Sequence, residues 1–144
     1  MTELQNGNLG FKLSGKVMHG EHYGKILGFP TANIDRRDLS KKKIKISYGV
    51  WAGYGEIKNR YSKLKIFPAG VILGPVDSKG LPKIEAHLIG FKGSLYGKYL
   101  NIYLNTYLRP FKKFKSKEIL KKQIKQDLKK IIKILKWNKK NLAQ

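Results

Sequence analysis

Thr31 and Asn33 stand two residues apart in the stretch LGFPTANID (27–35), directly after Gly28 and Pro30. In an extended segment, side chains two residues apart share one face. Hydroxyl and carboxamide oxygens are hard ligands, and Mg²⁺ takes one or two protein ligands together with phosphate oxygens and water. Pro30 has a fixed φ and would pre-organise the pair. The same residues also suit a tight turn in which Asn33 satisfies local backbone N–H groups, so the spacing leaves both interpretations open.

Glycines are frequent in the stretch before this pair, at Gly15, Gly20 and Gly24. Glycine lets successive backbone N–H groups turn toward one point and form an anion-binding nest. Lys25 would add a point charge beside a bound phosphate. The stretch contains neither the P-loop pattern nor the dinucleotide-binding fingerprint. It therefore indicates a phosphate cradle only if other parts of the chain support one.

Glu85 is a second candidate for chemistry, because the chain has only nine acidic residues against 31 lysines and arginines. It lies in KIEAHLIGF (83–91), where apolar residues alternate with polar ones in the period of a β-strand. A carboxylate there suits a general base that takes a hydroxyl proton. A cross-strand ion pair with a lysine is the alternative. His19, His22 and His87 form no metal-ligand pattern, and we expect each to be hydrogen-bonded or exposed.

Arg109 is one of four arginines in a chain that otherwise uses lysine. At the end of a predicted strand, it indicates either a planar, bidentate contact with a ligand or a structural salt bridge. The tyrosines at 99, 103 and 107 lie on one face of that strand. They suit either a stacking surface for rings or bases, or ordinary cross-strand packing.

The elements that must position these residues are mostly strands. Apolar or alternating runs predict strands at 11–19, 49–57, 64–73, 83–91 and 98–108, with a turn at Asn59-Arg60. From 116 to 138 the period changes, and apolar residues recur every three or four positions, which is typical of an amphipathic helix. Ser116 is the expected N-cap, with Glu118 in the first turn. The pattern predicts an antiparallel barrel or sandwich with a helix packed on it.

Length and composition set further bounds. The 144 residues suit one domain, and the absence of cysteine excludes disulfides, thiolate metal sites and cysteine nucleophiles. No apolar run approaches the roughly 20 residues of a membrane span, and the N-terminus has no signal-peptide pattern, so we expect a cytoplasmic protein. The net charge of +22 indicates either a solvated lysine-rich surface or a face that binds polyanions.

Taken together, these segments resemble the riboflavin kinase family. The resemblance runs in order over about residues 11–132 through the segments GKVMHG, GKILGFPTANI, YGVW, LGPV, IEAHLIGF, SLYGKYLNIYLNTYLRP and KKFKSKEILKKQIKQDLKKI. GFPTAN and LYGK are the most specific of these. The chain departs from the pattern of bacterial members at His22, Tyr23, Ile72 and Ser94.

The resemblance implies an all-β fold: a six-stranded antiparallel Greek-key barrel at about 11–110, with a C-terminal α-helix at about 116–137 packed on it, in a single domain over 1–144. It implies transfer of the ATP γ-phosphoryl group to the riboflavin 5′-hydroxyl to give FMN, with Glu85 as the general base. It also implies the following binding residues: for the nucleotide Gly20, Lys25, Gly28, Pro30, Thr31 and Asn33; for Mg²⁺ Thr31 and Asn33; for the flavin Tyr96, Gly97 and Arg109.

Riboflavin and ATP are thus the expected partners, with no membrane, no obligatory nucleic acid, and a monomeric state. Bacterial members are often fused to an adenylyltransferase domain, and the chain has no room for one, so we expect FMN synthesis without the FAD step. The alternative hypothesis is a small basic barrel that binds nucleic acid, or a flavin-binding module without turnover.

Overall fold

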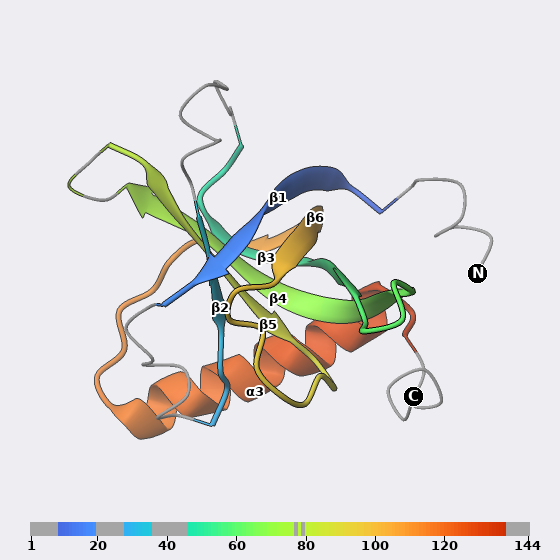
Figure 1. Cartoon of the computed structure of the whole chain (residues 1–144). Helices are drawn as coiled ribbons and strands as arrows, with labels where there is room; N and C mark the ends of the chain where they lie inside the picture. Colours follow the sequence, from blue (N-terminus) through green and yellow to red (C-terminus); the bar gives the residue numbers. More distant parts are fainter. Residues whose placement is uncertain (1–8, 20–27, 36–45, 77, 79, 138–144) are drawn as a thin grey trace.

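The computed structural model describes residues 9–19, 28–35, 46–76, 78 and 80–137. Its described strands close into an antiparallel barrel in the order β1-β2-β5-β4-β3-β6 (Figure 1). Their bounds are β1 Phe11–Met18, β2 Ala32–Ile34, β3 Gly49–Lys58, β4 Leu64–Val76, β5 Pro82–Leu88 and β6 Tyr99–Arg109; helix α3 follows at Lys117–Ile134. The six-stranded closed barrel with a C-terminal helix, predicted from the resemblance, is confirmed within these residues.

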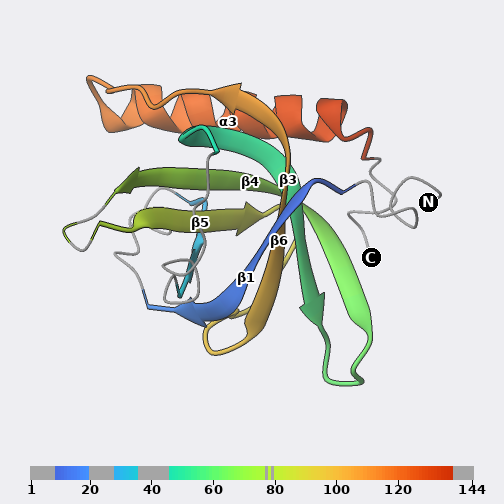
Figure 2. The same cartoon turned by 90° about the horizontal axis from the view of Figure 1, so that it is seen from above.

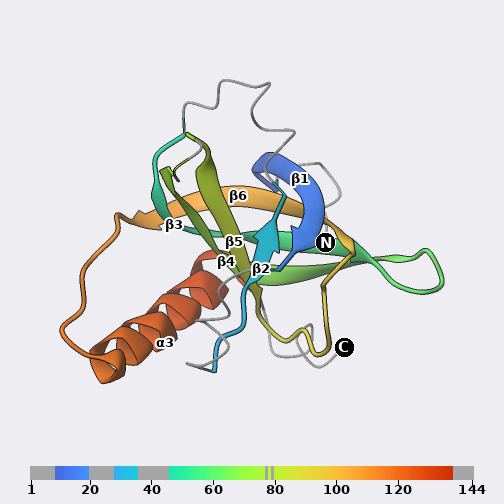
Figure 3. The same cartoon turned by 60° about the vertical axis from the view of Figure 1, so that its left-hand side comes forward.

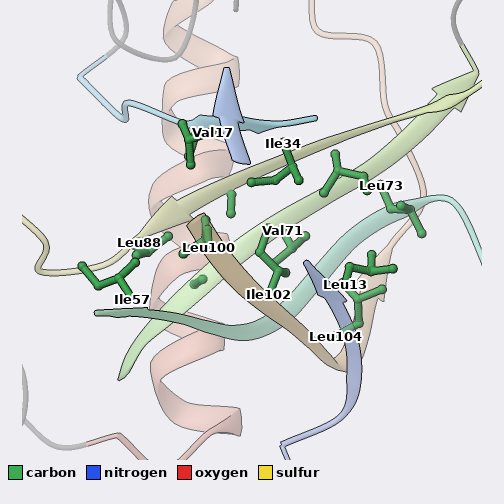
Figure 4. Packing of buried hydrophobic residues seen from close by; sticks show 14 residues of the cluster. Leu13, Val17, Ile34, Ile57, Val71, Leu73, Leu88, Leu100, Ile102 and Leu104 are labelled. Atoms are coloured by element: carbon green, nitrogen blue, oxygen red, sulfur yellow. The ribbon is translucent and has the colours of Figure 1, made fainter. Parts of the chain in front are cut away.

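Alternating side chains of the strands fill the barrel interior (Figure 4). On β6, Leu100, Ile102 and Leu104 are almost completely buried, as the strict alternation predicts. Val71 and Leu73 of β4 meet them from another wall of the barrel. Burying a side chain of this size is worth about 1.5–3 kcal/mol, so the interior supplies the rigid frame on which outward-facing residues are held.

The long strands β3 and β4 form a hairpin that extends beyond the barrel wall. Asn59 closes it: its Oδ1 accepts hydrogen bonds from the backbone N–H groups of Tyr61 at 2.8 Å and Lys63 at 3.1 Å. The turn predicted at Asn59-Arg60 is therefore confirmed. Because asparagine side chains satisfy turn N–H groups in this way, the hairpin tip is ordered by local chemistry.

Helix α3 starts where the sequence predicts and ends earlier. The Ser116 hydroxyl accepts a hydrogen bond from the Ile119 backbone N–H, which is an N-cap. The predicted end near residue 137 is wrong by about one turn, because Lys136 takes a left-handed conformation with φ 54°. The Trp137 N–H then bonds the Ile132 carbonyl at 3.0 Å, which is the closing bond of a Schellman motif.

Helix α3 packs on the outer surface of the barrel, chiefly on β4 and also on β3 (Figure 2). Ile131 is fully buried there. Gly70 of β4 allows this approach, since a Cβ at that position would lie 3.2 Å from Ile131 Cδ1. Trp137, with the chain turned back after the helix, packs beside Tyr54 and Leu9 in a second apolar cluster. Among the described residues, no helix combines the length and apolar character that crossing a bilayer requires.

Strand β2 is the element that places Thr31 and Asn33. It has three residues and lies between β1 and β5, pairing with both (Figure 3). Segment 110–116 connects the end of β6 to the start of α3 (Figure 3). The helix therefore lies on the side of the barrel where Thr31 and Glu85 are found. The outer surface of β2 and β5 and the inner surface of α3 are thereby brought toward each other.

Candidate active site

The two oxygen-bearing residues of the GFPTAN stretch face the same way. Ala32 and Ile34 are buried in the barrel interior, whereas Thr31 and Asn33 are partly buried on the outer side. This is the face-sharing that a spacing of two residues predicts for an extended segment. Among the described residues, neither the Thr31 hydroxyl nor the Asn33 carboxamide makes a hydrogen bond. Both oxygens are therefore available to a ligand on this surface.

Glu85 lies next to this pair, although it is far away in the sequence. In the register of β2 and β5, Asn33 is the direct partner of Glu85. Ile84, Ala86 and Leu88 point into the core, so Glu85 points to the outer face with Asn33. The strand and the facing predicted for Glu85 are confirmed. A carboxylate, a carboxamide and a hydroxyl thus gather on one patch of two adjacent strands.

His87 fixes the segment that leads into β2. Its Nδ1 lies 2.7 Å from the Pro30 carbonyl oxygen, a hydrogen bond in which the ring nitrogen donates. The Phe29 ring packs edge-on against the same imidazole, with centroids 5.9 Å apart. His87 is therefore a hydrogen-bonded histidine, as expected, and it holds residues 29–31 against β5. No pattern in the sequence predicts this contact, because it joins two distant segments.

Gly28 is the last glycine of the glycine-rich stretch and the first residue of the described segment 28–35. Its φ is +90°, a conformation that favours glycine, and a Cβ there would meet no atom within 4 Å. Pro30 follows on the surface, with its carbonyl bound to His87. Gly20 and Lys25, the two other predicted phosphate-binding residues, lie outside the described residues.

Two cavities border Glu85. The larger, of about 430 Å³, lies between the barrel wall and α3; Thr31, Glu85 and Arg109 line it, together with apolar side chains of α3 and the segment before it. The apolar lining residues on that side are Phe111, Phe114, Leu120, Ile124, Leu128 and Ile131. The smaller, of about 230 Å³, is lined by Met18, His19, Asn33, Ile34, Asp35, Lys83, Ile84 and Glu85. Glu85 and Lys83 line both cavities.

Arg109 is held by a carboxylate on α3. Its Nη2 donates to Asp127 Oδ2 at 2.7 Å, and its Nε donates to both carboxylate oxygens at 3.2 Å. Gln123 donates to the same carboxylate at 2.9 Å. The side chains of Arg109 and Asp127 are only 14% and 8% exposed. The salt-bridge interpretation of Arg109 is thus present in the structure, and the arginine also lines the larger cavity.

Tyr96 and Gly97 lie on the other side of Glu85, away from Arg109. The Tyr96 ring stacks on His19 with centroids 3.8 Å apart, and His19 lines the smaller cavity. Gly97 has φ +80°, and its N–H donates to the Val17 carbonyl at 3.0 Å. Neither residue lines the larger cavity. The structure therefore brings Thr31, Asn33 and Glu85 together, with Arg109 across one cavity and the Tyr96 loop beside the other.

Two tyrosines of the predicted stripe make packing contacts. The Tyr107 hydroxyl donates to the Tyr48 carbonyl at 3.0 Å, and its ring packs edge-on against Trp51. Tyr103 lies beside Glu56, and both its burial and that carboxylate raise the pKa of its phenol. These contacts match the cross-strand packing alternative for these two residues.

The donors around Thr31 and Asn33 are oxygen ligands, which suits a hard cation such as Mg²⁺. Within the described ranges, no group of three or more histidine, cysteine or acidic side chains is placed to hold a metal ion. A Mg²⁺ site needs only one or two protein oxygens, because phosphates and water supply the other ligands. Such a site fits the oxygen atoms of Thr31 and Asn33 and requires no cluster of acidic residues or histidines.

The family model described as "Flavokinase: Riboflavin kinase" matches residues 8–135. The "Bifunctional riboflavin kinase/FMN adenylyltransferase" of Escherichia coli K12 is 34% identical over 99 residues, which cover 64% of this chain and 28% of that protein. The chain thus spans about 28% of the length of this curated relative.

Two solved structures share the fold, each with a TM-score of 0.68 and 24% identity. The structure described as "riboflavin kinase from Trypanosoma brucei" aligns over 88% of this chain and 80% of its own. The one described as "Macrolide-efflux Protein from Streptococcus pneumoniae" aligns over 89% and 44%. At this identity the likeness concerns the fold alone. From the family model, which matches most of its length, the chain belongs to the riboflavin kinase family.

Proposed function

We propose that this protein is a riboflavin kinase, which transfers the γ-phosphoryl group of ATP to the 5′-hydroxyl of riboflavin to give FMN and ADP. The observation that carries the proposal is the position of Glu85. It lies opposite Asn33, next to the outward-facing Thr31, and borders two cavities. A carboxylate at the boundary of two sites is where a base must be if an alcohol from one site attacks a phosphate from the other.

The larger cavity suits the flavin. Its volume falls in the range of small-molecule sites, and its α3 side is apolar, as an isoalloxazine ring requires. Arg109 adds a planar cation whose orientation is fixed by Asp127. A ring held there would direct its ribityl chain toward Glu85, which lines the same cavity.

The triphosphate is assigned to the Thr31–Asn33 side. Gly28, with its positive φ, ends the glycine-rich stretch next to Thr31. Gly20 and Lys25, which the sequence predicts as phosphate-binding residues, would contact the same triphosphate. The hydroxyl of Thr31 and the carboxamide oxygen of Asn33 would hold Mg²⁺ together with the phosphates. When bound, the ion offsets negative charge on the β- and γ-phosphates.

The chemical step then depends on positioning. Glu85 accepts the proton of the 5′-hydroxyl as its oxygen attacks the γ-phosphorus, and the bond from phosphorus to the bridging oxygen breaks to release ADP. General-base catalysis of this kind contributes about 10²–10⁴-fold. The rigid barrel holds both substrates in place, and alignment together with fixed charges provides most of the remaining acceleration.

The test is to mix the protein with riboflavin and Mg·ATP and to separate the flavins and the adenine nucleotides by chromatography. FMN and ADP should appear in equal amounts. The same chromatogram shows whether any FAD forms, which tests the expectation that the FAD step is absent. A folded protein that binds riboflavin but forms no FMN would identify a flavin-binding module instead and would contradict the proposal.

A further inference from the structure

Helix α3 carries a dense positive surface that the proposed kinase does not use. Of its residues Lys117–Ile134, the exposed ones include seven lysines, and the only exposed acid is Glu118. We call these seven the lysine face: Lys117, Lys121, Lys122, Lys125, Lys129, Lys130 and Lys133. The other acid of the helix, Asp127, is buried and paired with Arg109.

The lysines stand next to one another along the helix. Lys117, Lys121, Lys125, Lys129 and Lys133 are separated by four residues each. Like charges at this spacing destabilise a helix by about 0.2–0.5 kcal/mol per pair. Lysines and acids alternating at this spacing would keep the helix surface equally soluble and would also stabilise the helix. The like-charge row therefore indicates a surface that receives its counter-charge from outside the molecule.

The lysine face points away from the cavities. The opposite side of α3, with Ile124, Asp127 and Leu128, faces the larger cavity and the barrel. The whole barrel lies on one side of the helix (Figure 2). Nucleotide phosphates at Thr31 and Asn33 are on the barrel side, so binding ATP does not account for these charges.

We propose that the lysine face binds the phosphate backbone of double-stranded nucleic acid without reading its sequence. Lys122, Lys125, Lys129 and Lys133, at spacings of three and four residues, lie on one side of α3 and span about 17 Å of helix axis. A duplex carries one charge per roughly 1.7 Å of its own axis, both strands counted, so about ten phosphate charges fall within that length of duplex. Lysine ammonium groups are point charges, suited to phosphate contacts rather than to bidentate base contacts.

A duplex fits this surface better than a membrane does. Most apolar residues of α3 pack against the barrel, with Ile131 fully buried, and the exposed ones are Ile119 and Ile134, near opposite ends of the helix. Two isoleucines so far apart form no continuous apolar face with which to enter the headgroup region, as interfacial helices do. The contact is left to charge alone, and a linear row of charges matches a linear polyanion.

The test measures fluorescence anisotropy of a labelled 20-base-pair duplex between 50 and 200 mM salt. The variant Lys122→Gln/Lys125→Gln/Lys129→Gln is compared with Lys58→Gln/Arg60→Gln/Lys63→Gln on the β3–β4 hairpin, which removes the same charge. Each lost phosphate contact lowers the slope of log K against log salt by about 0.9, so the α3 variant should lose about 3 and bind at least about tenfold more weakly at 50 mM salt. The hairpin variant should change little.

Three results would overturn the proposal: no duplex binding by the wild-type protein at 50 mM salt, equal losses in both variants, or binding to phosphatidylserine vesicles in preference to the duplex. Glutamine keeps helix propensity, so the α3 variant should remain folded by circular dichroism. Lys122→Arg/Lys125→Arg/Lys129→Arg should restore binding, because charge rather than shape is the claim. FMN formation should be unchanged in all variants, which separates this test from that of the kinase.

Discussion

Asn33 on β2 and Glu85 on β5 are direct partners across an antiparallel pair of strands. Their neighbours Ala32 and Ala86, the next pair in register, are buried in the barrel core. A shift of one residue in either strand would turn one of the two polar side chains into the core, so the core packing fixes their common face. The proposed ligand for Mg²⁺·ATP and the proposed base are therefore set side by side by the barrel itself.

Glu85→Gln tests the base. Glutamine keeps the size and the hydrogen-bonding oxygen but cannot take a proton at neutral pH, so turnover should fall at least about tenfold and by up to 10²–10⁴-fold. The measurement is steady-state FMN formation, with the far-UV spectrum and riboflavin affinity as evidence of folding. Glu118→Gln, on the exposed side of α3, is the matched control and should turn over normally. Normal turnover of Glu85→Gln would remove the base assignment.

Thr31→Ala and Asn33→Ala test the magnesium ligands. Loss of even an outer-shell partner commonly weakens metal binding 10–100-fold, so the Mg²⁺ concentration for half-maximal rate should rise by about tenfold or more in each variant. Thr31→Ser retains the hydroxyl and should behave nearly as the wild type. Thr106→Ala, far along β6, serves as a control. If both alanine variants respond to limiting Mg²⁺ as the wild type does, the ligand assignment is wrong.

Asp127→Asn tests whether the carboxylate on α3 positions Arg109. The change leaves a nearly buried guanidinium without its counter-charge, and breaking a fully buried pair costs about 3–5 kcal/mol, less where one partner is 14% exposed. We expect a lower melting temperature and a higher KM for riboflavin, with a smaller change in kcat. Arg109→Lys should raise the same KM, since lysine lacks the planar fork. A variant with unchanged riboflavin KM would leave Arg109 a structural residue only.

The strands other than β2, and helix α3, could be predicted from the sequence because their patterns are local. Alternation over 83–91 and 98–108 places the core side of β5 and β6, and Ser116 marks the start of the helix. The helix end could not be predicted, because a lysine at position 136 gives no signal of a left-handed conformation. Glycine is the usual residue there.

The sequence predicts which residues form the candidate site, but it does not predict how they are arranged in space. That Asn33 faces Glu85, and that His87 holds the Pro30 carbonyl, depends on how β2 and β5 pair across a long sequence separation. Strand β2 is also only three residues long, too short for its alternation to distinguish a strand from a turn. Asp127 lies in the predicted amphipathic helix with no sequence signal of its own, and only its buried contact with Arg109 gives it a role.

Gly53→Ala tests the close approach of β3 and β6. A Cβ at this position would lie 2.0 Å from the Tyr103 carbonyl oxygen, which is backbone and cannot move aside without breaking the pairing. Overpacking of this kind costs about 1–3 kcal/mol or more in the free energy of unfolding. Gly70→Ala is the milder comparison, because its Cβ would meet only side-chain ends, Ile131 Cδ1 at 3.2 Å and Leu128 Cδ2 at 3.8 Å. Urea unfolding should show a clearly larger loss of midpoint for Gly53→Ala than for Gly70→Ala.

Tyr103 makes stability fall at alkaline pH. Burial and the neighbouring Glu56 carboxylate raise the pKa of its phenol above the ordinary value of about 10. The unfolded chain therefore releases this proton first as the pH rises, so it binds fewer protons than the folded protein and the free energy of unfolding declines above about pH 10. Tyr103→Phe removes the titrating group. Urea unfolding from pH 8 to 11 should show a steeper loss for the wild type than for the variant. Parallel curves would contradict the linkage, because the lysines that titrate in this range are common to both proteins.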